Sequence, residues 1–133
     1  SEGIFENFIK SMDNEIKNYK NEKNLVSFLN IFEKYKEILV SFTKWTREKI
    51  NSNKDDASAA CNDYLKVLGL IAVGHSWIKV LEVSFDEYDN NKNFYEDKIQ
   101  TAKFFFQRVL PRVNTHCISA MSGSGYIMNF NFN

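Results

Sequence analysis

The residue types that usually carry chemistry are few in this sequence, and their spacing does not favour catalysis. A carboxylate-bridged di-iron bundle needs a Glu three residues before a His on each of two helices. Ala72 and Val113 occupy those positions before His75 and His116, so neither histidine fits such a site. We therefore predict no metal-ligating residue. We expect His75 to be a hydrogen-bonded core residue and His116 to lie at a helix boundary.

The cysteines and glycines also lack the patterns of a reactive site. Cys61 and Cys117 have no Cys-x-x-Cys partner and lie at no expected helix N-terminus, so we expect two buried, inert thiols. Gly69 and Gly74 fall inside an expected helix, where they cannot form a phosphate-binding loop, and no Walker-type motif is present. The sequence thus predicts no catalytic and no cofactor-binding residue in this chain.

The charges exclude a general nucleic-acid binder. The chain has 17 basic and 17 acidic residues and a net charge of zero, whereas such binders carry a basic excess. Of the basic residues between Lys98 and Arg112, only Arg108 and Arg112 share a helix face at about 100° per residue. An anion clip formed by these two arginines, which would contact a ligand, is one interpretation that the sequence leaves open.

Length and composition predict one helical domain over residues 1–133. One proline and five glycines are too few breakers for a β-rich fold. The longest charge-free apolar run, Val67–Ile78, is too short to span a bilayer, so we predict no membrane span. Two cysteines make no disulfide framework, and we expect a cytoplasmic protein. The first residue is not Met, so we expect a chain that is processed, tagged or cut from something longer. Together with the few breakers, this fits a helical piece of a larger protein.

Apolar periodicity predicts the first two helices. In the first, large apolar residues recur at helical spacing from Ile4 to Tyr19, with a polar turn expected over residues 17–24. The second carries two apolar heptad positions, which indicate a bundle core. These heptad residues are Leu25, Phe28, Phe32, Tyr35, Leu39, Phe42 and Thr46. Residues 51–56 are polar and are predicted to form a loop.

The third helix is expected from Ala57 to Tyr88 and has almost no solvent face in its centre. A helix that is apolar on all sides is covered on all sides. Its cover is either the other helices of a small bundle or another domain or subunit. Gly69, Ala72 and Ser76 would allow a neighbouring backbone to approach closely.

The fourth helix is expected from Asn93 to about Met121, with a kink or restart at Pro111. Its predicted core stripe includes Ile99, Phe106 and Val109. With short connections between neighbours, the four helices predict an all-α, antiparallel up-down-up-down four-helix bundle.

Two segments resemble the extra C-terminal helical domain of one acyl-CoA dehydrogenase subgroup, which includes enzymes acting on 3-methylmercaptopropionyl-CoA. The residues from Asp63 to Trp77 are similar to a "YL…G…G..W" helix of that domain. The residues from Phe94 to Arg112 are similar to its "FY..K..TA.F.F.R.LPR" segment, and Gly123 to Met128 resemble its ending. The sequence departs from that domain at residues 114–116, which are polar where the domain is often alanine-rich.

The resemblance implies that this chain is the C-terminal structural or interface domain of an FAD-dependent flavoenzyme. In that family a separate catalytic body oxidises an acyl-CoA between Cα and Cβ. The resemblance places FAD and the acyl-CoA in the parent enzyme, which is expected to be a homo-oligomer. None of the catalytic residues belongs to this chain, which is expected to be inactive by itself.

Pattern and resemblance together predict an apolar docking surface for the catalytic body or a sister subunit. Phe104 falls off the core stripe of its helix, and the last residues are apolar and uncharged. The predicted interface residues are Leu70, Val73, Trp77, Phe104, Ile127, Met128, Phe130 and Phe132. The alternative is a free-standing helical protein-interaction module that binds a partner helix through the same surface.

Overall fold

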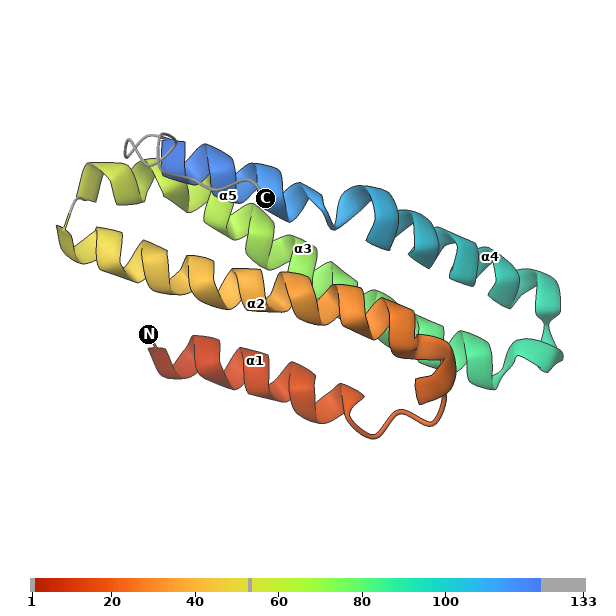
Figure 1. The fold of residues 1–133 in the computed structure, drawn as a ribbon. Helices are drawn as coiled ribbons and strands as arrows, with labels where there is room; N and C mark the ends of the chain where they lie inside the picture. The colour runs from red at the N-terminus through yellow and green to blue at the C-terminus, as the bar shows by residue number, and fades with distance from the viewer. Residues whose placement is uncertain (1, 53, 123–133) are drawn as a thin grey trace.

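The chain folds as the antiparallel four-helix bundle that the sequence predicts. The structure is a computed structural model that describes residues 2–52 and 54–122, and these contain helices and no strand. The fourth helix of the bundle is divided into two segments, α4 and α5 (Figure 1). The α-helices are α1 (Glu2–Ile16), α2 (Glu22–Ser52), α3 (Lys54–Asp86), α4 (Lys92–Phe104) and α5 (Arg112–Ser122).

Helix α3 is the central element of the bundle. It contacts α1, α2, α4 and α5, and its closest and longest contact is with the antiparallel α2. The start of α1, the end of α2, the start of α3 and the end of α5 all lie at one end of the bundle (Figure 1). A short 3₁₀ helix, Tyr88–Asn90, turns the chain at the other end between α3 and α4.

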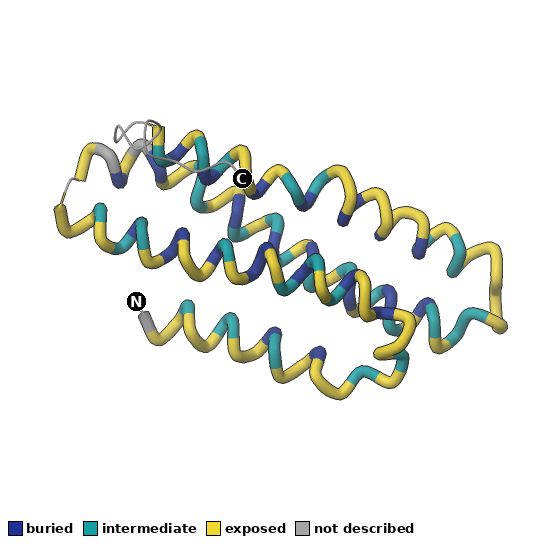
Figure 2. Tube along the Cα trace, in the orientation of Figure 1, coloured by how far each residue is buried: buried dark blue, intermediate teal, exposed yellow. Residues whose placement is uncertain are grey.

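The heptad stripe of α2 is buried as predicted, and buried positions recur along this helix in Figure 2. Phe32 and Leu39 are completely inaccessible to solvent. Burying a side chain of this size stabilises the fold by about 1.5–3 kcal/mol relative to leaving it exposed. The stripe residues, all buried, are Leu25, Phe28, Phe32, Tyr35, Leu39, Phe42 and Thr46.

The turn between α1 and α2 is anchored by a side chain of α3. The Glu82 carboxylate accepts hydrogen bonds from the backbone N–H groups of Lys20 (2.9 Å) and Asn21 (3.1 Å). A negative group at this position also suits the positive N-terminal end of the α2 dipole. The predicted polar turn is confirmed, and Tyr19, which the periodicity assigned to the first helix, lies in that turn and packs on the core.

The predicted loop over residues 51–56 is wrong. Helix α2 continues to Ser52 and α3 already begins at Lys54. The polar composition was misleading because the end of one helix and the start of the next both face water. An acidic residue in the first turn, such as Asp55, also favours a helix start through the helix dipole.

The predicted interruption at Pro111 is confirmed, but it begins earlier as a π-helix over Phe105–Val109. The Leu110 N–H donates to the Phe105 carbonyl five residues back, at 2.8 Å. Pro111 has no N–H to donate and clashes with a regular helical turn, so the chain restarts at Arg112. The wider π turn rotates the residues that follow it around the helix axis. Leu110 is therefore completely buried, in the place where the apolar periodicity predicted Val109.

The two glycines of α3 have different surroundings. A Cβ atom at Gly74 would lie 3.3 Å from ring carbons of Phe32 and 3.5 Å from the Phe105 ring. A Cβ atom at Gly69 would meet no atom within 4 Å. Gly74 therefore allows α2 and the π-helix to approach α3, whereas Gly69 has no such role within the described residues.

We expect opposite effects from substituting these glycines. Gly69→Ala should raise the free energy of unfolding by about 0.5–1 kcal/mol, because alanine is the better helix former. Gly74→Val should lower it by about 1–3 kcal/mol, because the new methyl groups overpack the Phe32 ring. Urea unfolding followed by circular dichroism measures both. Equal effects of the two substitutions would contradict the packing difference.

Candidate functional site

One face of α3 is both exposed and uncharged. Between Lys66 and Lys79, its exposed residues are Gly69, Val73 and Ser76. Helix α2 also lies in the centre of the bundle, but its outward face carries exposed charged residues such as Lys34 and Glu37. Exposed apolar surface on a central helix is typical of an interaction site. This face of α3 is the first candidate for a functional surface.

The predicted interface residues are only partly brought together. Val73 is 47% exposed on α3 and Phe104 is 61% exposed on α4, off the core stripe as expected. Leu70 and Trp77 are partly buried and pack against the core of the chain itself. The other four, Ile127, Met128, Phe130 and Phe132, lie outside the described residues. That these side chains form a docking surface stays a prediction.

His75 lies where α1 packs on α3. Its Nε2 atom is 3.1 Å from Glu15 Oε2, outside hydrogen-bond geometry, and Lys79 Nζ is 3.2 Å from Glu15 Oε1. The imidazole also lies beside the Phe32 ring, with 6.4 Å between ring centroids. Burial lowers the pKa of His75; the Glu15 carboxylate opposes this shift and the Lys79 ammonium adds to it. The expected core position is confirmed in part, and the expected hydrogen bond at Nε2 is not formed.

His116 joins α5 to α3. Its Nδ1 atom lies 3.0 Å from Asp63 Oδ1, and both side chains are mostly buried. The expectation that His116 faces a helix boundary is therefore wrong: it lies within α5 and faces α3. A carboxylate such as that of Asp63 can orient a histidine for metal binding or catalysis, but no third ligand lies beside this pair in the part of the chain that the structure describes. Among the described residues, no group of three His, Cys, Asp or Glu side chains could hold a metal ion.

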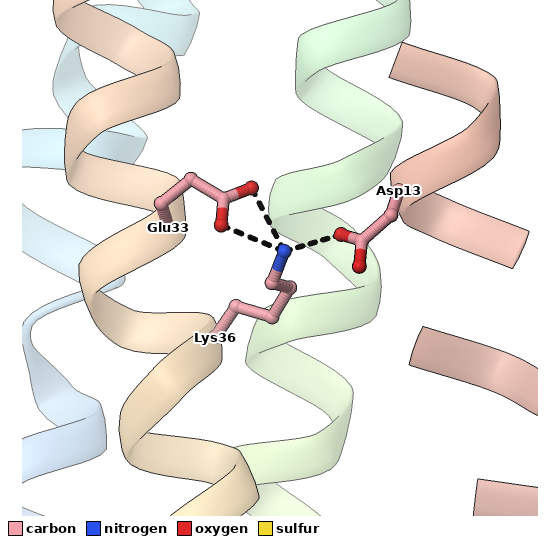
Figure 3. A network of polar contacts seen from close by, with 3 residues as sticks. All are labelled: Asp13, Glu33 and Lys36. Carbon is pink, nitrogen blue, oxygen red and sulfur yellow. Dashed lines mark hydrogen bonds and ion pairs between the residues drawn. The ribbon is translucent and has the colours of Figure 1, made fainter. Parts of the chain in front are cut away.

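The buried Lys36 side chain joins α1 to α2 through two carboxylates (Figure 3). The residue is 6% exposed, and its ammonium pairs with Asp13 of α1 and with Glu33 at 2.7–2.8 Å. Burial lowers the pKa of Lys36, but the hydrogen bonds to Asp13 and Glu33 outweigh it and leave the pKa above its usual value. A cation held in this way is a structural clamp rather than a catalytic base.

The two thiols differ, which corrects the expectation that both are buried. Cys117 is buried, and burial with the nearby Asp63 charge raises its pKa to about 12. Cys61 is exposed. The helical pattern of α3 did not predict this difference, because residue 61 lies one turn after the buried Ala57 and borders the same face.

A second candidate is a groove that the sequence did not reveal. The first turns of α1, the last turns of α2 and the first half of α3 enclose an open groove of about 720 Å³. Two strongly exposed apolar residues, Ile4 (73%) and Ile50 (52%), belong to its lining. The only sign of this groove in the sequence was the position of Ile50, an apolar residue outside the heptad stripe of α2. The groove is lined by Ile4, Phe5, Phe8, Thr43, Thr46, Arg47, Ile50, Asn51, Ala57, Cys61, Tyr64 and Leu68.

The comparisons with known proteins decide the family. The family model described as "acetyl-CoA dehydrogenase C-terminal like" matches residues 8–131, which is nearly the whole chain. The chain belongs to this family. Neither the curated proteins nor the solved structures gave a significant match. The match extends over all four helices of the bundle. It includes most of α1 and all of α2, which lie outside the segments that carry the sequence resemblance.

In this acyl-CoA dehydrogenase C-terminal-like domain, part of α3 is long and apolar enough to cross a membrane by length and composition. That segment is Ala60–Asp86, and one such helix is weak evidence because the core helix of a bundle has the same properties. Its residues Val67, Ile71 and Ile78 are completely buried against the rest of the domain. The sequence prediction of no membrane span stays a prediction.

The lowered pKa of His75 predicts how the stability of the domain depends on pH. The unfolded chain takes up a proton at the ordinary pKa of about 6.5, and the folded chain does so only at lower pH. The free energy of unfolding should therefore fall as the pH drops below about 6.5, until the folded domain is protonated as well.

His75→Gln should remove this part of the pH dependence, as measured by urea unfolding between pH 8 and pH 5. Glu15→Gln should have the opposite effect, because it removes the carboxylate that favours the protonated imidazole. Identical profiles for wild type and His75→Gln would contradict the assignment.

Proposed function

We propose that this chain is the C-terminal interface domain of an acyl-CoA dehydrogenase and that it is inactive by itself. The observation that carries the proposal is the family match over residues 8–131. The segments Asp63–Trp77 and Phe94–Arg112 both lie within the match, which supports the subgroup that includes 3-methylmercaptopropionyl-CoA dehydrogenases. The clusters around Lys36, His75 and His116 support a structural role, because each joins two helices.

The described residues contain no Rossmann-type dinucleotide site for the FAD that such a parent enzyme would use. A site of that type has a glycine-rich turn leading into a free helix N-terminus for the pyrophosphate. Gly69 and Gly74 lie within α3 instead. The N-terminus of α2 is occupied by the Glu82 carboxylate, and that of α4 by the Asn91 side chain, which accepts from the Phe94 N–H at 3.3 Å. We therefore assign FAD and the acyl-CoA to the catalytic body of the parent.

The partner of the domain is, in this proposal, the catalytic body or a sister subunit in a cytoplasmic homo-oligomer. The exposed face of α3 around Val73 is suited to it, because it carries no charge between Lys66 and Lys79, and Phe104 on α4 adds an aromatic side chain that is 61% exposed. The alternative is a free-standing module that binds a partner helix. The two differ in one property, which is whether a flavoprotein body precedes this domain in the same polypeptide.

The size of the native polypeptide tests the parent enzyme directly. An immunoblot of source cells with an antibody against this chain should show a band several times heavier than 15.6 kDa. The purified species should carry flavin absorbance that is bleached by an acyl-CoA substrate. A native band at 15.6 kDa would instead establish the free-standing module.

A matched pair of substitutions tests the exposed face of α3. Val73 and Val40 are 47% and 43% exposed on the two central helices, so Glu at either site should leave the fold intact. In the intact parent, Val73→Glu should weaken domain docking or subunit association at least about tenfold, because it buries an unpaired charge in the contact. Val40→Glu should not. Light scattering after gel filtration measures association, and equal effects would exclude this face.

A further inference from the structure

The groove between α1, α2 and α3 is open, apolar and close in size to ligand and peptide-binding clefts, which measure about 300–1,000 Å³. Phe5 and Phe8 of α1 form one wall, and Leu68 of α3 belongs to the opposite wall. Ile4 and Ile50 are among the most exposed large apolar residues that the structure describes, and both border this one groove.

The two threonines, the tyrosine and the arginine of the groove already have partners. Thr43 Oγ1 and Tyr64 Oη lie 2.9 Å apart, and Thr46 donates to the Phe42 carbonyl at 2.9 Å. The one cation in the lining, Arg47, is 2.9 Å from Glu6 and also lies over the Phe5 ring. An occupant therefore has no charge to neutralise here, and charge complementarity favours uncharged, apolar side chains.

The path of the backbone indicates where such side chains come from. Helix α1 is described from Glu2, only two residues before Ile4 in the lining of the groove. Under the proposed function, the catalytic body joins the domain at this end. A segment tethered within a few residues of a groove has an effective concentration in the millimolar range, which favours docking even through a small apolar surface.

We infer that this groove is a docking site for apolar side chains of the parent polypeptide just before α1. This inference rests on the proposed function and names a contact separate from the exposed face of α3. The partner is an uncharged segment of the parent itself, so the domain is fixed to the body at its point of attachment as well as through the Val73 face.

Cys61 is a natural reporter for the groove, because it lines the groove and is exposed, while Cys117 is buried. The intact parent is treated with N-ethylmaleimide, and the labelling rate of Cys61 is measured by peptide mass spectrometry. A Ser41→Cys variant supplies the control, since Ser41 is exposed on the outward face of α2. Each rate is divided by that of the same cysteine in urea.

The inference predicts that Cys61 reacts at least about tenfold more slowly than the control cysteine in the intact parent. Ile4→Glu should restore most of the Cys61 rate, because it places a charge in the groove at a side chain that is already 73% exposed and so spares the fold. These two results together support the inference.

Other results overturn it. Equal rates for Cys61 and the control in the parent would show an open groove, while the size and flavin of the parent would still support the proposed function. Protection that is lost on deletion of residues 123–133 would assign the groove to the C-terminal segment of the chain. Protection that depends on protein concentration would assign it to a second copy. A native chain of 15.6 kDa would remove the proposed function and this inference together.

Discussion

The burial of α3 is the physical constraint on which the rest of the bundle depends. A helix with no charge from Val67 to Ile78 cannot lie against water on all sides, so the other helices collect around it. Helix α2 covers one side with its aromatic heptad stripe, and α4 and α5 cover another. Gly74 lets the Phe32 ring approach the α3 backbone closely. The centre of α3 remains exposed around Val73.

Helix α1 is attached in a different way from the other helices. Its buried apolar residues are Met12 and Ile16, near its C-terminal end. The ion pair of Asp13 with Lys36 lies beside these residues, whereas towards its start α1 is held by the ion pair of Glu6 with Arg47. Exposed ion pairs contribute little to stability, whereas a buried one such as that of Lys36 is costly to break. This arrangement explains why the groove opens beside the first turns of α1 and is closed near its end.

The polar clusters show why this domain has no evident chemistry. His116 and Lys36 each use a charged partner to connect two helices, whereas His75 packs beside Glu15 without a hydrogen bond at Nε2. None of the three combines with a nucleophile or a third ligand in the described residues. The thiol with a raised pKa is buried, and the exposed thiol has no base beside it that the structure records.

The sequence by itself determined the helices and most of the core, because apolar periodicity directly reports which face of a helix avoids water. It also gave the interruption at Pro111, which follows from the missing N–H of proline. It did not give the π-helix, the burial of Leu110, the helical residues on either side of position 53 or the groove. The pairing of His116 with Asp63, 53 residues away, also needed the packed helices. These features depend on distances between helices, which no local pattern contains, and only the tertiary structure decided them.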